Sequence, residues 1–299
     1  MKILICSDGL SSADNAIRFI ARTAAACSAE VTLLGVVEHP EGEASLQESL
    51  RREAQVLHDE GVQVQIVMGK GHPIPQIQQR TLVANYDLVV VGAERKKSSP
   101  FALSTKAYHM IQRIDPPVLM TIGRLVELRR ILVCSSGTPP LDRTIELTAA
   151  IARGSHAAVT LLHVLAEPPL IYSDLLERQI SGVDKLLASN FSLAKSLRRE
   201  KAAYERLEVP VEVKLRSGGI ADEILRESRA RDFDLIVAGS TRTRGVLRAY
   251  VMGDVTAAIV DGADCAVLVV RNAIQPKAQK QHFASCRRLF QMLKAQWKS

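Results

Sequence analysis

The chain has 299 residues, of which 47% are hydrophobic and 24% are charged, and this composition excludes a disordered protein. The length fits one large domain or two domains of about 150 residues each. No apolar run approaches the roughly 20 residues of a membrane-spanning helix, and no signal peptide pattern opens the chain, so we expect a cytoplasmic protein.

The predicted elements of the first half begin with short apolar runs that do not alternate with polar residues. These runs are ILI at 3–5, VTLLGVV at 31–37, LVVV at 88–91 and PVLM at 117–120. Such runs are typical of strands buried on both faces of a parallel sheet, whose connections are usually helices. Residues 12–25 supply one such helix, with Ile17, Ile20 and Ala24 on one face. Val62, Val64 and Ile66 do alternate with polar residues, which indicates a strand nearer a sheet edge.

The second half repeats the first in the same order. KILICSDG at 2–9 recurs as RILVCSSG at 130–137, and VTLLGV at 31–36 recurs as VTLLHV at 159–164, both 128 positions later. SLRRE at 49–53 recurs at 196–200 and DLVVVG at 87–92 recurs as DLIVAG at 234–239, both 147 positions later. The single step in offset indicates a 19-residue insertion between 164 and 196, where leucines at helical spacing predict an extra or longer helix.

The repeat predicts two tandem α/β domains, each a doubly wound, Rossmann-like parallel sheet of five strands. We place the first domain at 1–124, the second at 128–272 and a tail at 273–299. In such sheets a ligand lies beyond the carboxyl ends of the strands.

Several of these segments together resemble a universal stress protein domain. They are SDG at 7–9, VTLLGV, a helix start with Gly71 and Pro73, DLVVVG, and PPVLM at 116–120. The resemblance covers nearly the whole chain apart from the tail and identifies it as similar to the tandem type of the family. It implies the fold of the adenine nucleotide alpha hydrolases and an intrachain pseudo-dimer in which the two domains pair through their last strands.

Nucleotide-binding members of that family carry a G-x2-G-x9-G-(S/T) loop after strand 4 and an aspartate at the end of strand 1. Glycines allow backbone N–H groups to approach phosphate, and the following helix start adds its positive dipole end. The first copy keeps Asp8 and Gly92, but Arg95 stands at the second glycine and Ser104 and Thr105 stand near the third. These two hydroxyls are candidates to cap a helix and contact an anion, and a solvated basic loop is the alternative.

The second copy keeps more glycines and loses the aspartate. Its loop runs through Gly239, Gly245 and Gly253, while Arg242 stands at the second glycine and Ser136 replaces the strand-end aspartate. Each copy has therefore lost a different part of the family's site. The resemblance predicts degenerate sites that have drifted from nucleotide binding or changed ligand, with ATP or another adenine nucleotide as the alternative ligand and no required cofactor.

The sequence favours a binding protein over an enzyme. Cys6 and Cys134 end equivalent strands, yet no repeated histidine accompanies them, and we expect inert buried thiols. The phosphate-binding patterns GxxxxGK(S/T) and GxGxxG are absent. Five scattered cysteines without a CxxC pair and seven scattered histidines predict neither a disulfide framework nor a metal site.

The net charge of +7 is concentrated near the C-terminus, since no acidic residue follows Asp264. Residues 281–299 place apolar side chains at spacings of three or four between basic ones, which predicts a basic amphipathic helix. It would pack on the body or across a homodimer, and an anionic membrane surface is the next hypothesis. Nucleic acid is disfavoured because no reading motif accompanies the charge.

Together these features predict a non-catalytic stress-response protein that acts by binding a ligand or a partner. An ATP-binding switch or weak ATPase that uses one of the loops is the alternative. A lipid-associated adaptor that uses the tail is a second alternative.

Overall fold

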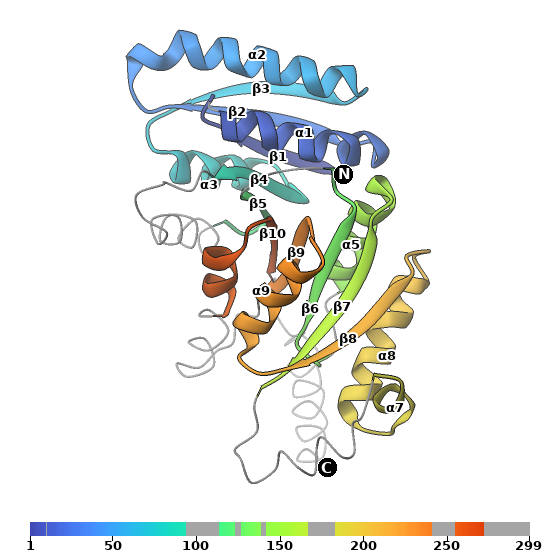
Figure 1. Ribbon diagram of the computed structural model, residues 1–299. Helices are drawn as coiled ribbons and strands as arrows, with labels where there is room; N and C mark the ends of the chain where they lie inside the picture. The colour runs from blue at the N-terminus through green and yellow to red at the C-terminus, as the bar shows by residue number, and fades with distance from the viewer. Residues whose placement is uncertain are drawn as a thin grey trace, which may run out of the picture.

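A computed structural model gives one sheet of ten strands, built in the described residues from two similar halves (Figure 1). The described residues are 1–9, 11–93, 114–122, 127–138, 142–166, 183–240 and 255–271, with the backbone alone for 11–15, 93, 240 and 271. The first half contains β1 (Lys2–Ser7), α1 (Ser11–Ala26), β2 (Glu30–Val37), the 3-10 turn η1 (Pro40–Gly42), α2 (Glu43–Asp59), β3 (Gln63–Lys70), α3 (Pro73–Val83), β4 (Leu88–Ala93) and β5 (Val118–Ile122).

The second half repeats this order of strands and long helices, and α7 and a helix at 255–262 have no counterpart among the described residues of the first half. It contains β6 (Arg130–Ser135), α5 (Asp142–Ser155), β7 (Ala158–Leu165), α7 (Val183–Ala188), α8 (Ser192–Glu205), β8 (Val211–Ser217), α9 (Ile220–Ala230), β9 (Leu235–Ser240), a helix at 255–262 and β10 (Ala266–Arg271). The helix α7 lies in the predicted insertion, where Leu186 is buried. The rest of the insertion, 167–182, and the predicted tail, 273–299, lie outside the described residues.

The strands follow the order β3-β2-β1-β4-β5-β10-β9-β6-β7-β8. Within each half all neighbours are parallel, which confirms the two doubly wound units. The two halves join through their last strands, where β5 and β10 pair antiparallel with Leu119 opposite Leu268. This pairing at the centre of Figure 1 agrees with the pseudo-dimer that the family resemblance implied, and it removes one exposed edge from each sheet.

The central strands are buried on both faces, as their unbroken apolar runs predict. Ile3, Leu4 and Ile5 are fully buried and alternate between two cores. Ile3 and Ile5 face the core that includes residues of α1, α2, α5 and α8, whereas Leu4 faces the core that includes Ile77 of α3 and Ile224 of α9. Burial of each such side chain stabilises the fold by about 1.5–3 kcal/mol.

The helices α1 and α5 also connect the halves. Gly154 of α5 lies close to Ala26 of α1, and Arg22 forms an ion pair with Glu127 at 2.7 Å. None of the helices in the described part of the chain is both long and apolar enough to cross a bilayer.

Candidate functional site

The carboxyl ends of the parallel strands form one candidate site in each half. In the first half Cys6 of β1 pairs with Val91 of β4, so the following residues, Asp8 and Gly92, lie at the same end of adjacent strands. Asp8 is exposed and Gly92 is partly buried. In the second half Cys134 pairs with Ala238, which brings Gly239 to the equivalent position beside the end of β6. The structure thus places these three predicted residues at the strand ends, and their binding role stays a prediction.

The other predicted site residues lie outside the described part of the chain. They are Ser104 and Thr105 of the first half and Arg242, Gly245 and Gly253 of the second.

A serine and a buried glutamate hold the turn after the first strand. The Oγ of Ser7 donates to Glu53 Oε1 at 2.7 Å and accepts the N–H of Gly9 at 3.0 Å. Glu53 comes from α2 and is only 1% exposed. Gly9 has a φ of +74°, in the left-handed region that favours glycine. This contact fixes the backbone on which Asp8 sits.

The same arrangement recurs in the second half: a serine at the strand end bonds both a buried glutamate and a glycine N–H, and we call this arrangement the turn lock. Ser135 Oγ donates to Glu200 Oε2 at 2.6 Å and accepts the N–H of Gly137 at 3.2 Å. Gly137 has a φ of +72°, close to that of Gly9. Burial raises the pKa of Glu200, against the opposite effect of the hydrogen bond from Ser135. Both glutamates are the last residue of the repeated SLRRE segment, which was the signal that could have revealed them.

The two strand ends differ in the residue that follows VTLL. In β2 this residue is Gly35, and a Cβ there would come within 2.5 Å of Leu50 Cδ1 of α2. In β7 it is His163, whose Nδ1 lies 2.9 Å from the carbonyl oxygen of Ser135. Because a carbonyl can only accept, Nδ1 carries the proton in this contact. The half-buried imidazole therefore lies against the second turn, where a Cβ on Gly137 would come within 2.8 Å of it.

The strand-end thiols are not prepared for nucleophilic chemistry. Burial raises the pKa of Cys6 and of Cys134 to about 12, so both thiols are protonated near neutral pH. The described residues contain no group of three His, Cys, Asp or Glu side chains placed to hold a metal ion.

The sequence profile of the universal stress protein family matches residues 1–121 and 127–271 of the chain. The chain belongs to the universal stress protein family. Each half of the sheet therefore corresponds to one universal stress protein domain.

Similar proteins agree with this tandem arrangement. A universal stress protein of Methanothermobacter thermautotrophicus is 27% identical over 145 residues, which cover 48% of this chain and 95% of that protein. A universal stress protein from Archaeoglobus fulgidus DSM 4304 aligns with a TM-score of 0.66 and 15% identity, over 91% of this chain and 98% of that one. A functionally unknown protein from Pseudomonas aeruginosa PAO1 aligns with a TM-score of 0.61 and 18% identity, over 90% and 92%. At these identities the two structures show the fold alone.

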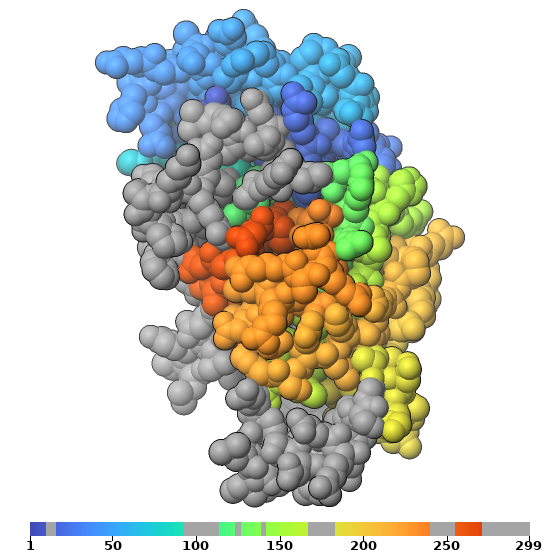
Figure 2. Space-filling view, viewed as in Figure 1, coloured from blue at the N-terminus to red at the C-terminus, as the bar shows by residue number. Residues whose placement is uncertain are grey.

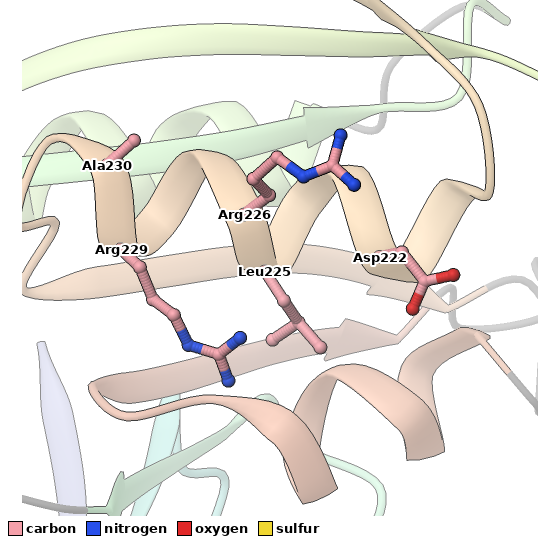
Figure 3. A pocket seen from close by; sticks show the side chains of 5 residues that line it. All are labelled: Asp222, Leu225, Arg226, Arg229 and Ala230. Carbon is pink, nitrogen blue, oxygen red and sulfur yellow. The ribbon is translucent and has the colours of Figure 1, made fainter.

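A groove of about 590 Å³ runs along α9 in the second universal stress protein domain (Figure 3). Its largest side chains are already engaged by neighbouring groups. Arg229 donates to Asp264 Oδ2 and to the carbonyl of Gly262, both at 2.7 Å. Leu225 points toward the helix at 255–262, where a Cβ on Gly262 would come within 2.3 Å of it. The groove therefore marks the packing of two helices and offers no catalytic constellation.

A second groove of about 430 Å³ lies at the ends of β7 and β8. Two arginines line it, and each is paired with a carboxylate. Arg216 binds Glu227 and Arg226 binds Glu223. Each arginine is therefore held by a carboxylate of its own domain, although Glu227 also pairs with Lys214, so this end keeps a net positive charge.

Proposed function

We propose that this tandem universal stress protein is a non-catalytic regulatory protein that acts by binding a small ligand or a partner, and that its strand ends are degenerate nucleotide sites. The observation that carries this proposal is the contrast at the two strand ends. The first keeps an exposed Asp8, whereas the second has Ser136 in its place and the imidazole of His163 against the turn. One domain of the pair has therefore lost the charge that the family uses and has gained a bulky side chain beside it.

The chemistry of the described strand-end groups supports the absence of catalysis. Nucleophilic catalysis needs an activated nucleophile with a base beside it. The hydroxyls of Ser7 and Ser135 each donate to a buried carboxylate and accept a backbone N–H, so both functions are occupied in holding the turn. The thiols of Cys6 and Cys134 are protonated at neutral pH. None of these groups is poised to attack a substrate.

Nucleotide content tests the proposal directly. The full chain is purified from cells and denatured, and the released adenine nucleotide is quantified against protein. ATP is then titrated by calorimetry, and phosphate release is followed with time. We expect no stoichiometric nucleotide, no saturable heat at micromolar ATP, and phosphate release equal to that of a protein-free blank.

Three variants test the alternative, an ATP-binding switch. Micromolar ATP binding that is abolished by Asp8→Ala and retained by Ser136→Ala would overturn the proposal in favour of a nucleotide site in the first domain. Binding abolished by Gly239→Val would place the site in the second domain, with the same consequence.

A further inference from the structure

The two outer strands of the ten-stranded sheet differ in charge, because one is mostly uncharged and the other is rich in charged residues. β3 and β8 stand at the two ends of the strand order and are equivalent in the repeat. On the face toward α3 and α9, three neutral positions of β3 correspond to three charged positions of β8. The pairs are Gln65 with Glu212, Val67 with Lys214, and Gly69 with Arg216.

The β8 edge is protected by an inward-facing charge network. Glu227 of α9 is fully buried and accepts hydrogen bonds from Lys214 and Arg216. Glu212 pairs with Arg231 at 3.1 Å. Inward-pointing charges on an outer strand are one of the ways in which proteins prevent pairing with another chain, because such pairing would desolvate them.

The β3 edge has no such protection. No charged residue stands between Gln63 and Gly69, and Ile66 is 39% exposed. The helix position equivalent to Glu227 is Arg80, which points its Nε to the hydroxyl of Tyr86 at 3.0 Å and not to β3. An outer strand that is uncharged from Gln63 to Gly69, ends in Lys70 and is rich in β-branched and apolar side chains is suited to edge pairing.

The backbone of β3 presents donors outward. Gly71 N–H donates to the carbonyl of Val37 at 2.9 Å, so this amide points toward β2. Because amides alternate in direction along a strand, those of Ile66 and Met68 point away from β2. Among the described residues β3 pairs only with β2, which leaves these amides on the outer edge (Figure 2 shows the α2 and β3 end of the molecule).

We propose that the β3 edge binds a second copy of this chain by antiparallel β3–β3 pairing about a two-fold axis. A two-fold axis makes the same strand serve as both partners, and two neutral edges meet without like-charge repulsion. The chain already uses this type of contact once, because β5 and β10 join its halves by antiparallel pairing of equivalent strands. A second copy at β3 would extend the sheet in the same way, whereas the charged β8 edge would stay at its end.

Two variants that place opposite charges at the same position of β3 test this surface. Gln65→Lys and Gln65→Glu are each prepared in the full chain and analysed by sedimentation velocity, alone and as an equimolar mixture. We expect the unmodified chain to form dimers, each variant alone to dimerise with a Kd raised by up to about fivefold by like charges on the two paired strands, and the mixture to recover the dimer. Recovery in the mixture shows that both variants are folded.

The matched control is Gln55→Lys, which adds the same charge on the exposed face of α2 and should leave the dimer unchanged. As a second variant, Ile66→Pro removes one outward amide, keeps the ladder to β2 and is expected to give monomers with an unchanged far-ultraviolet spectrum. A monomeric unmodified chain at about 100 µM, well above the Kd of a specific dimer, would overturn the proposal. So would a dimer that Gln65→Lys weakens no more than Gln55→Lys does.

Discussion

The two universal stress protein domains share the groups that hold their first turn and differ in the groups around it. Ser7, Gly9 and Glu53 have direct counterparts in the second domain, with the same hydrogen bonds and nearly the same φ at the glycine. By contrast, Ser136 stands at the position equivalent to Asp8, and His163 stands at the position equivalent to Gly35. We infer that the turn serves the fold, since both domains keep it although the residues around it differ.

A second difference lies at the outer strands. The second domain surrounds Glu227 with Lys214 and Arg216, and the first domain has uncharged residues at the two equivalent strand positions. Surface strands and strand ends are where ligands and partners contact such a sheet. Both differences thus lie where the ligand and partner contacts proposed above would be made.

The largest effect of this difference is expected from Glu227→Ala. Its carboxylate is fully buried, and its removal leaves Lys214 and Arg216 facing each other without the neutralising charge. Breaking such a pair by removal of one partner costs about 3 kcal/mol. We expect a loss of that size in the free energy of unfolding of the second domain, measured in urea by fluorescence and circular dichroism.

The equivalent change in the first domain is Arg80→Ala, which removes one hydrogen bond to Tyr86 and should cost about 1 kcal/mol. Equal losses in the two variants would contradict the view that only the second domain has a charge-dependent edge.

The next largest effect is expected at the residue after VTLL. Gly35→Ala would place a Cβ within 2.5 Å of the buried Leu50 Cδ1, and overpacking of this kind costs about 1–3 kcal/mol. His163→Ala removes one hydrogen bond to the Ser135 carbonyl and should cost about 1 kcal/mol. Thermal unfolding of both variants gives the comparison, and a more damaging His163→Ala would show that the imidazole supports the fold of its domain.

Much of the fold could be predicted from sequence because its signals are local. Unbroken apolar runs identified the central strands, and the alternation of Val62, Val64 and Ile66 identified β3 as an edge strand. The repeat of these patterns gave the two halves. The pairing of the halves through their last strands came from the family resemblance, because apolar strands such as 118–122 carry no mark of their partner, and the antiparallel direction came from the structure.

The site was predictable only in part because its contacts join distant segments. Asp8 and Gly92 are recognisable from the ends of their strands. The Ser7–Glu53 contact joins residues 46 positions apart. In the sequence each of the two residues is seen only to recur in the second half, and nothing indicates that they are in contact. His163 is visible as the single mismatch between VTLLGV and VTLLHV, but only packing shows that it lies against the second turn.

The smallest predicted effect concerns the pH dependence of the second turn. Burial raises the pKa of Glu200 above its ordinary value of 4.5, so the folded state holds this proton more tightly than the unfolded state does. As pH rises from 4.5 through the folded pKa, the unfolded state releases the proton first, and the stability contributed by the protonated group is lost. Glu200→Gln keeps an acceptor for Ser135 and removes this titration.

The variant should therefore gain stability relative to the unmodified protein as pH rises from about 4.5 to about 8, by roughly 1 kcal/mol at most in urea unfolding. Glu205→Gln, an exposed position on the same helix, serves as the control and should follow the unmodified profile.

Glu227 makes the comparison sharper because its pKa is shifted the other way. Burial alone would raise that pKa, but hydrogen bonds from Lys214 and Arg216 lower it, so its contribution is present above 4.5 and is lost in acid. Parallel pH profiles for Glu200→Gln and the unmodified protein would mean that the Glu200 carboxylate is as well solvated in the folded chain as in the unfolded one, and that the turn lock is held by an ionised group.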